Sequence, residues 1–193
     1  MRVDCLDFFN LPAKELAPKL LGMQLCRNID GEIIKTKITE VEAYCGEKDT
    51  ACHSSVGKTK RNASMWKDGG TIYVYLCYGL HFMLNIVCAG DNPEAVLIRG
   101  VDIAKGPGVL TKKLFINKSF DGEDIKTSQK IWLECDDKDF ELLPFNQKNL
   151  QINTQKHKKN SKKTPKIQKL CRVGIDYANK KDREAKLRFL LKE

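Results

Sequence analysis

The stretch from Thr71 to Val87 constrains the fold of this chain more than any other. It reads TIYVYLCYGLHFMLNIV, two apolar and aromatic runs on either side of Tyr78-Gly79. Such runs around a short glycine-containing turn predict a β-hairpin. Polar residues usually occupy a hairpin turn, yet here a tyrosine precedes the glycine. Either the Tyr78 ring folds back onto its own strands, or it stays exposed, where an aromatic side chain can act as a wedge between stacked bases.

The length and composition of the chain predict one globular domain over residues 1–193. A chain of 193 residues can bury about 70% of its unfolded surface, and 41% apolar with 31% charged residues is ordinary for a folded protein. No apolar run approaches the roughly 18 residues that a membrane helix needs. Asp4 and Asp7 interrupt the N-terminal stretch that a signal peptide would require. We expect a soluble cytoplasmic protein without a membrane partner.

The formal net charge of +9 favours a polyanionic partner, because basic surfaces release counterions when they bind nucleic acid. Much of the excess lies in a lysine-rich segment at about residues 156–169, which we expect to be a solvated loop that adds loose phosphate contacts. The eight cysteines are scattered from Cys5 to Cys171 without a Cys-x-x-Cys pair. We expect reduced thiols, no bound metal and no cofactor.

A second hairpin is predicted around Asp30-Gly31, and its second strand carries candidate chemistry. Strict alternation places two sets of side chains on opposite faces of this strand: Ile34, Thr36, Ile38, Glu40, Glu42 and Tyr44 on one, and Lys35, Lys37, Thr39, Val41 and Ala43 on the other. Two carboxylates and a tyrosine therefore share one face near the strand end. They form either a reactive group on a rigid scaffold or a solvent-facing edge with hydrated glutamates.

The remaining segments predict a strand-rich α+β fold. Residues 45–70 form a long irregular segment, typical of a functional or disordered loop, which contains His53. A strand at AVLIRGV contains one charge, Arg99, which needs a carboxylate partner such as Glu40 or Glu42; a plain salt bridge would satisfy it equally. Helices are expected at residues 11–22 and 105–116, and strands at 130–135, at 141–145, around 170–178 and at 186–193. We expect these helices to surround a curved antiparallel sheet.

Several sequence blocks resemble one known family, in the same order along the chain. They are TEVEAYCG, ACHS, KRNASMW, GGTIYVYLCYGLHFMLNI, VLIRG, GPGVL, FINKSF and RVGIDYA. Over nearly its whole length the chain resembles 3-methyladenine DNA glycosylases of the alkyladenine DNA glycosylase family. The resemblance implies a monofunctional repair enzyme that flips a damaged purine out of duplex DNA and hydrolyses its N-glycosidic bond, leaving an abasic site. It would act alone, as a monomer, in the nucleoid of a bacterium or the nucleus of a eukaryote.

The resemblance also implies roles for the catalytic residues. Glu42 matches the general base, Arg99 the arginine that orients the catalytic water, and Val173 the position whose main-chain carbonyl does the same. This agrees with the chemistry, because a glycosidic carbon in an oxocarbenium-like transition state needs a carboxylate to accept a proton from water and to stabilise positive charge.

The same resemblance implies the residues that contact DNA. Tyr44, His53 and Tyr75 match residues that stack on or contact the flipped base, and an aromatic pocket favours the cationic rings of 3-methyladenine and 7-methylguanine. Asn85 matches the asparagine that excludes normal guanine, and with His53 it would govern neutral lesions such as hypoxanthine and ethenoadenine. Tyr78, at the tip of a protruding hairpin, matches the tyrosine that fills the vacated place in the stack.

The chain departs from the family pattern at His81, where some members have an aromatic residue, and in the lysine-rich segment, which has no evident counterpart. A non-catalytic module that binds distorted nucleic acid is the main alternative, but it would not need Glu42, Arg99 and the aromatic set together. A zinc-dependent base deaminase is excluded because the His-x-Glu and Cys-x-x-Cys signature is absent.

Overall fold

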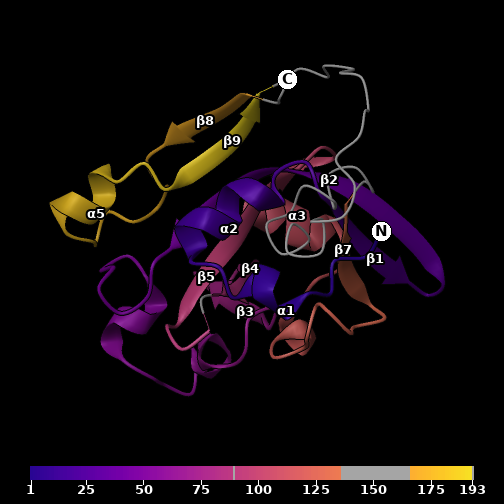
Figure 1. The fold of residues 1–193 in the computed structure, drawn as a ribbon, viewed down its shortest axis with the longest axis horizontal. Helices are drawn as coiled ribbons and strands as arrows, with labels where there is room; N and C mark the ends of the chain where they lie inside the picture. The colour runs from indigo at the N-terminus through magenta and orange to yellow at the C-terminus, as the bar shows by residue number, and fades with distance from the viewer. Residues whose placement is uncertain (89, 136–165, 193) are drawn as a thin grey trace, which may run out of the picture.

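A computed structural model describes residues 1–88, 90–135 and 166–192. Their strands form one sheet of nine strands, in which β3-β4-β5-β2-β1-β7 is the main path, β6 (Ala104–Lys105) joins β5, and β9 joins β2 and β8 (Figure 1). Every pairing is antiparallel. The predicted α+β class with a curved antiparallel sheet is therefore confirmed.

The first hairpin pairs β1 (Gln24–Ile29) with β2 (Glu32–Tyr44) through the predicted Asp30-Gly31 turn. Both turn residues have positive φ, 50° at Asp30 and 95° at Gly31, the geometry that suits the twist of a two-residue hairpin. On its other edge β1 pairs with β7 (Ile131–Glu134). The long β2 strand then continues beyond β1 to carry the candidate glutamates.

An irregularity in β2 contradicts the predicted unbroken alternation. Against β5 (Glu94–Val101) the register shifts on both sides of Glu40, as happens at a β-bulge, where an extra residue bends the strand. Ile38 and Val41, predicted on opposite faces, consequently both join the hydrophobic core. Glu40 and Glu42 still share one face of β2. Ile38, which strict alternation would place on that face, lies in the hydrophobic core instead.

The second hairpin pairs β3 (Ile72–Cys77) with β4 (His81–Cys88), as the opening stretch predicted. β4 then pairs with β5, which brings Asn85 opposite Leu97. Because Leu97 in turn lies opposite Glu42 on β2, residues far apart in the sequence form one row across three strands. This row positions the candidate site.

Within the described residues the helices are few and short, and two of them pack against strands of the sheet. They are α1 (Leu6–Phe9), α2 (Ala13–Leu20), α3 (Pro107–Lys113) and α5 (Lys180–Glu184), with 3-10 turns η1 (His53–Val56), η2 (Ala63–Trp66) and η3 (Lys118–Phe120). Figure 1 shows α2 lying across the sheet near β2 and β5. Leu16 and Leu20 of α2 are fully buried in the main core. Apolar burial therefore holds one face of β2 against α2, and the glutamates lie on the other face.

The C-terminal residues form a further hairpin, in which β8 (Lys166–Leu170) pairs with β9 (Arg188–Lys192) and β9 pairs with β2. The predicted closing strand is confirmed. Residues 166–169, assigned above to a lysine-rich loop, are instead part of β8, since they bond to β9. The predicted strand around 170–178 is wrong, because β8 ends at Leu170. The rest of the lysine-rich loop and the expected strand at 141–145 fall outside the described residues.

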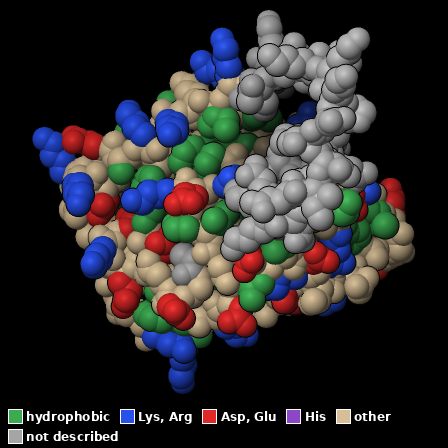
Figure 2. Space-filling model, in the orientation of Figure 1, with side chains coloured by type: hydrophobic (Ala, Val, Ile, Leu, Met, Phe, Trp, Pro, Cys, Tyr) green, Lys and Arg blue, Asp and Glu red, His purple; other side chains and the backbone are tan. Residues whose placement is uncertain are grey.

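Figure 2 shows lysine and arginine side chains interspersed with aspartate and glutamate on one face of the molecule. The positive net charge is thus not gathered into a field of one sign over the visible part of this face. Within the described ranges, no helix has the length and apolarity needed to cross a membrane.

Candidate active site

A cavity of about 510 Å³ opens between the β3–β4 hairpin, the ends of β2 and β5, η1 and the segment that follows β8. This volume is within the range of pockets that hold small molecules. Seven of the predicted site residues line it: Tyr44, His53, Tyr75, Tyr78, Asn85, Arg99 and Val173. The row of residues across β2, β5 and β4 therefore meets the loops around His53 and Val173 at one cavity.

Glu42, the eighth predicted residue, is fully buried directly behind the cavity wall. Its Oε2 accepts a hydrogen bond from the Tyr44 hydroxyl at 2.9 Å, and its Oε1 accepts one from the Val173 N–H at 2.8 Å. Arg99 Nη1 lies 3.4 Å from the same Oε1. All three partners line the cavity, so the carboxylate is held at its edge, and the alternative of a hydrated glutamate is wrong for Glu42.

Burial raises the pKa of Glu42 above its ordinary value, because an ionised carboxylate loses solvation there. The positive charge of Arg99, the Val173 N–H and the Tyr44 hydroxyl act in the opposite direction, in that order. A base with a raised pKa binds a proton more readily than an exposed glutamate, which suits it to accept one from water.

Arg99 has both of its predicted carboxylate partners. Its Nε donates to Glu40 Oε1 at 3.1 Å, and its Nη1 faces Glu42. Glu40 Oε1 also accepts a hydrogen bond from Arg188 Nη1 on β9 at 3.1 Å. The ion-pair interpretation of Arg99 is confirmed, and its fork holds two carboxylates that stand on one strand.

His53, Tyr73 and Tyr75 form an aromatic wall of the cavity. The His53 and Tyr75 rings lie 4.4 Å apart between centroids, and Tyr73 and Tyr75 lie 5.4 Å apart. His53 Nδ1 is 2.9 Å from the Tyr73 hydroxyl. Burial, with the nearby charge of Arg61, lowers the pKa of His53, whereas burial raises that of Tyr73. A neutral imidazole accepting from the Tyr73 hydroxyl at Nδ1 carries its proton on Nε2.

Asn85 is buried with a fixed orientation. Its side-chain NH₂ donates to the main-chain carbonyl oxygens of Tyr73 at 3.0 Å and Met83 at 3.2 Å. These two bonds anchor the amide to the hairpin, so it presents one fixed shape to the cavity rather than adapting to a ligand.

The tip of the β3–β4 hairpin is exposed and strained. Tyr78 is 88% exposed, so the alternative in which its ring folds back onto the strands is wrong. The Leu80 N–H bonds to the Cys77 carbonyl at 3.0 Å, which closes a two-residue turn with φ of 49° at Tyr78 and 70° at Gly79. A bulky residue in this left-handed region is uncommon and costs conformational energy.

Sequence reasoning missed several residues of the site. Tyr73 could have been found, because it stands two residues before Tyr75 and strand alternation puts both on one face. Arg61 and Tyr177, which also line the cavity, lie in loops without a periodic pattern. The same is true of Arg172, which is buried beside Val173.

Comparisons with known proteins agree with the sequence blocks. The family model of methylpurine-DNA glycosylase matches residues 7–105, slightly more than half of the chain. A relative from Natranaerobius thermophilus, provisionally named a 3-methyladenine DNA glycosylase, is 36% identical over 169 residues, covering 75% of this chain and 85% of its own length. Relatives with the same provisional name from Borreliella burgdorferi and Methanocella arvoryzae are 44% and 37% identical, each over 66% of this chain and over 75% and 74% of their own lengths. The predicted family is confirmed: the chain belongs to the methylpurine-DNA glycosylases.

Proposed function

We propose that this DNA glycosylase removes alkylated and deaminated purines from double-stranded DNA, with 3-methyladenine, 7-methylguanine, hypoxanthine and ethenoadenine as its substrate class. It acts as a monomer of one domain. The enzyme flips the damaged nucleotide into the aromatic cavity and hydrolyses the N-glycosidic bond, and the product is an abasic site. Family membership and the names of the relatives support the reaction type; the geometry of the cavity supports the residue roles.

In the proposed mechanism Glu42 is the general base. Water attacks the anomeric carbon of the sugar and gives a proton to the Glu42 carboxylate, while the carbon–nitrogen bond breaks and its electron pair leaves with the base. Arg99 and the main chain of Val173 position the water at the cavity edge. The negative charge of Glu42 also stabilises the positive charge that develops on the sugar.

The aromatic wall would hold the flipped base. Tyr44 and Tyr75 offer ring faces to a purine, and cationic alkylated purines gain more from such faces than neutral ones do. A proton on His53 Nε2 supplies a donor for neutral lesions. The anchored Asn85 amide would clash with the exocyclic amino group of guanine, since its two bonds to the hairpin prevent it from turning away.

The exposed Tyr78 would enter the gap that the flipped nucleotide leaves. Extruding a base costs a few kcal/mol of stacking and pairing, and an inserted aromatic ring recovers part of that. DNA is therefore the partner of the hairpin tip, and no cofactor takes part.

The observation that carries this proposal is a buried glutamate held by three groups that line an aromatic cavity. The test is to incubate the pure protein with duplexes that each contain one lesion of the four, and then to cleave abasic sites with alkali. We expect strand cleavage with lesions and none with an undamaged duplex of the same sequence. Absence of cleavage for all four lesions would contradict the proposal, and cleavage without alkali would indicate a lyase instead.

A further inference from the structure

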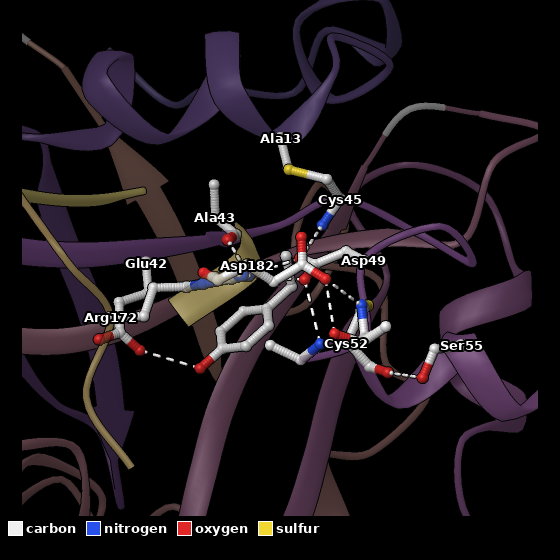
Figure 3. A network of polar contacts seen from close by, with 12 residues as sticks. Ala13, Glu42, Ala43, Cys45, Asp49, Cys52, Ser55, Arg172 and Asp182 are labelled. Atoms are coloured by element: carbon white, nitrogen blue, oxygen red, sulfur yellow. Dashed lines mark hydrogen bonds and ion pairs between the residues drawn. The ribbon is translucent and has the colours of Figure 1, made fainter. Parts of the chain in front are cut away.

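Asp49 and Arg172 form a buried ion pair behind the cavity. Arg172 follows β8 and its side chain is fully buried. Its Nη2 donates to Asp49 Oδ1 at 2.8 Å, and its Nη1 bonds to Asp49 Oδ2. The two residues are 123 positions apart in the chain, so this fork joins the loop after β2 to the loop after β8. Figure 3 shows the pair at the centre of a network that reaches Glu42, Ala43 and Cys45.

Each partner also fixes the main chain around it. Arg172 Nη1 donates to the Ala43 carbonyl at 2.9 Å, next to Glu42 on β2. Asp49 accepts hydrogen bonds from the main-chain N–H groups of Cys45 at 2.9 Å and Ala51 at 3.1 Å. The pair therefore fixes the main chain between the end of β2 and η1, the 3-10 turn that carries His53.

Both oxygens of Glu42 depend on groups that Arg172 holds. The Val173 N–H that bonds to Oε1 belongs to the residue that follows Arg172. The hydroxyl that bonds to Oε2 belongs to Tyr44. The ring of Tyr44 packs against the Arg172 guanidinium, whose Cζ lies 4.8 Å from the ring centroid. A shift of this guanidinium would move both hydrogen-bond donors together.

We propose that Arg172, fixed by Asp49, is a positioning residue that sets the orientation of the Glu42 carboxylate through Val173 and Tyr44. The inference rests on the proposed function, because it takes Glu42 to be the general base and assigns no chemistry to Arg172 itself. Burying an ion pair stabilises a fold little compared with an apolar pair of the same volume. Its geometry, in contrast, is specific: a planar fork and a flat face are properties that arginine has and lysine lacks.

The chain offers a matched control in Arg27 on β1. Arg27 is also buried and lies 4.8 Å from an aromatic ring, that of Phe120. Its Nε donates to the Leu114 carbonyl at 3.0 Å. It is not among the residues that line the cavity or contact Glu42. Arg27→Lys thus removes a buried guanidinium with its main-chain hydrogen bond and its ring contact, without touching the site.

The experiment is a double-mutant cycle on the single-turnover rate of hypoxanthine excision from a duplex. Rates are measured for wild type, Arg172→Lys, Glu42→Gln and the double variant, with Arg27→Lys as control, at a temperature where circular dichroism shows every variant folded. We expect Arg172→Lys to lower the rate about tenfold or more in the wild-type background but less than about twofold in the Glu42→Gln background. Arg27→Lys should stay within about twofold of wild type while it lowers the melting temperature.

Asp49→Asn is the second variant, because it removes the charge of the pair without changing its shape, and it should show the same dependence on Glu42. Losses that multiply in the double variants, an unchanged rate in Arg172→Lys, or an equal loss in Arg27→Lys would overturn the positioning role. An inactive wild type would instead overturn the proposed function, and this inference with it.

Discussion

The Glu42 corner and the tip of the β3–β4 hairpin border the same cavity but are built in opposite ways. Glu42 is 0% exposed and held through both of its oxygens, whereas Tyr78 is 88% exposed. The corner is thus organised before any ligand arrives, as general-base chemistry requires. The tip keeps its aromatic ring in water. This exposure is unfavourable, and it ends when the ring stacks on another ring. In the proposed mechanism, one cavity therefore combines a fixed general base with an exposed aromatic wedge.

The two hairpin turns of the chain sharpen this contrast. Asp30-Gly31 and Tyr78-Gly79 adopt the same left-handed conformations, and aspartate or asparagine is the preferred first residue of such a turn. The first turn has the stabilising residue. The second has a tyrosine that strains its turn, so stability alone does not account for Tyr78.

The largest effect should come from Glu42→Gln, which removes the base while keeping its shape. We expect the single-turnover excision rate to fall by roughly 100-fold or more, with lesion binding retained. Glu40→Gln is the matched control on the same strand. It weakens the hold on Arg99 but leaves the base, so it should cost about tenfold or less. Equal rates for Glu42→Gln and wild type would remove Glu42 from the mechanism.

A smaller effect, with a pH signature, is expected from Arg99→Gln. Burial raises the pKa of Glu42, and the charge of Arg99 is the strongest influence that lowers it. The ionised carboxylate is the active form, so the rate should fall as pH drops through this pKa, and the acidic limb of the pH–rate profile should lie above pH 4.5, the ordinary value. Arg99→Gln should move that limb to higher pH, because the ionised form loses its stabilising charge. An acidic limb that stays in place would show that Arg99 does not act on Glu42.

Tyr78→Asn should separate stability from function at the tip. Asparagine tolerates the left-handed conformation, so we expect folding to be unchanged or stabilised by up to about 1 kcal/mol, measured by thermal unfolding. Binding to a lesion-containing duplex should weaken, and less so when the lesion is mispaired, since less unstacking remains to be compensated. The reciprocal change Asp30→Tyr should destabilise the fold and leave binding unaltered. If Tyr78→Asn destabilises the protein, the ring supports the hairpin and the contrast fails.

Chelation should have the smallest effect of all. The proposed mechanism uses a carboxylate and water, so the excision rate should be the same with and without EDTA. Borohydride should trap no protein–DNA adduct, because no lysine attacks the sugar. Loss of activity on chelation, reversed by added metal, would contradict the first expectation, and a trapped adduct would contradict the second.

The sequence predicted those parts of the molecule in which local pattern and position agree. The two hairpins follow from β-rich runs around Asp30-Gly31 and Tyr78-Gly79, and the partners of Arg99 follow from the cost of burying a guanidinium. The order of the sequence blocks added the family, and seven of the residues that the resemblance assigned line one cavity.

The rest depended on tertiary contacts that leave no periodic trace. The bulge at Glu40 arises where β2 pairs with both β5 and β9. The residue types around Glu40 give no sign that the strand contains an extra residue there. Lys166 to Lys169 read as a solvated loop because of their charge, yet backbone pairing with β9 makes them a strand. Arg172 and Asp49 are 123 residues apart, so only the fold reveals that they meet behind Glu42.

The central claim is that one region performs the chemistry and the other the extrusion of the base. Stopped-flow fluorescence of a duplex containing ethenoadenine tests it most directly, because this base brightens when it leaves the stack. The account predicts that Glu42→Gln brightens the base as fast and as fully as wild type without releasing it. Tyr78→Ala should reach a lower fluorescence level and lose it sooner. Normal flipping in Tyr78→Ala, or a flipping defect in Glu42→Gln as large as its excision defect, would contradict the account.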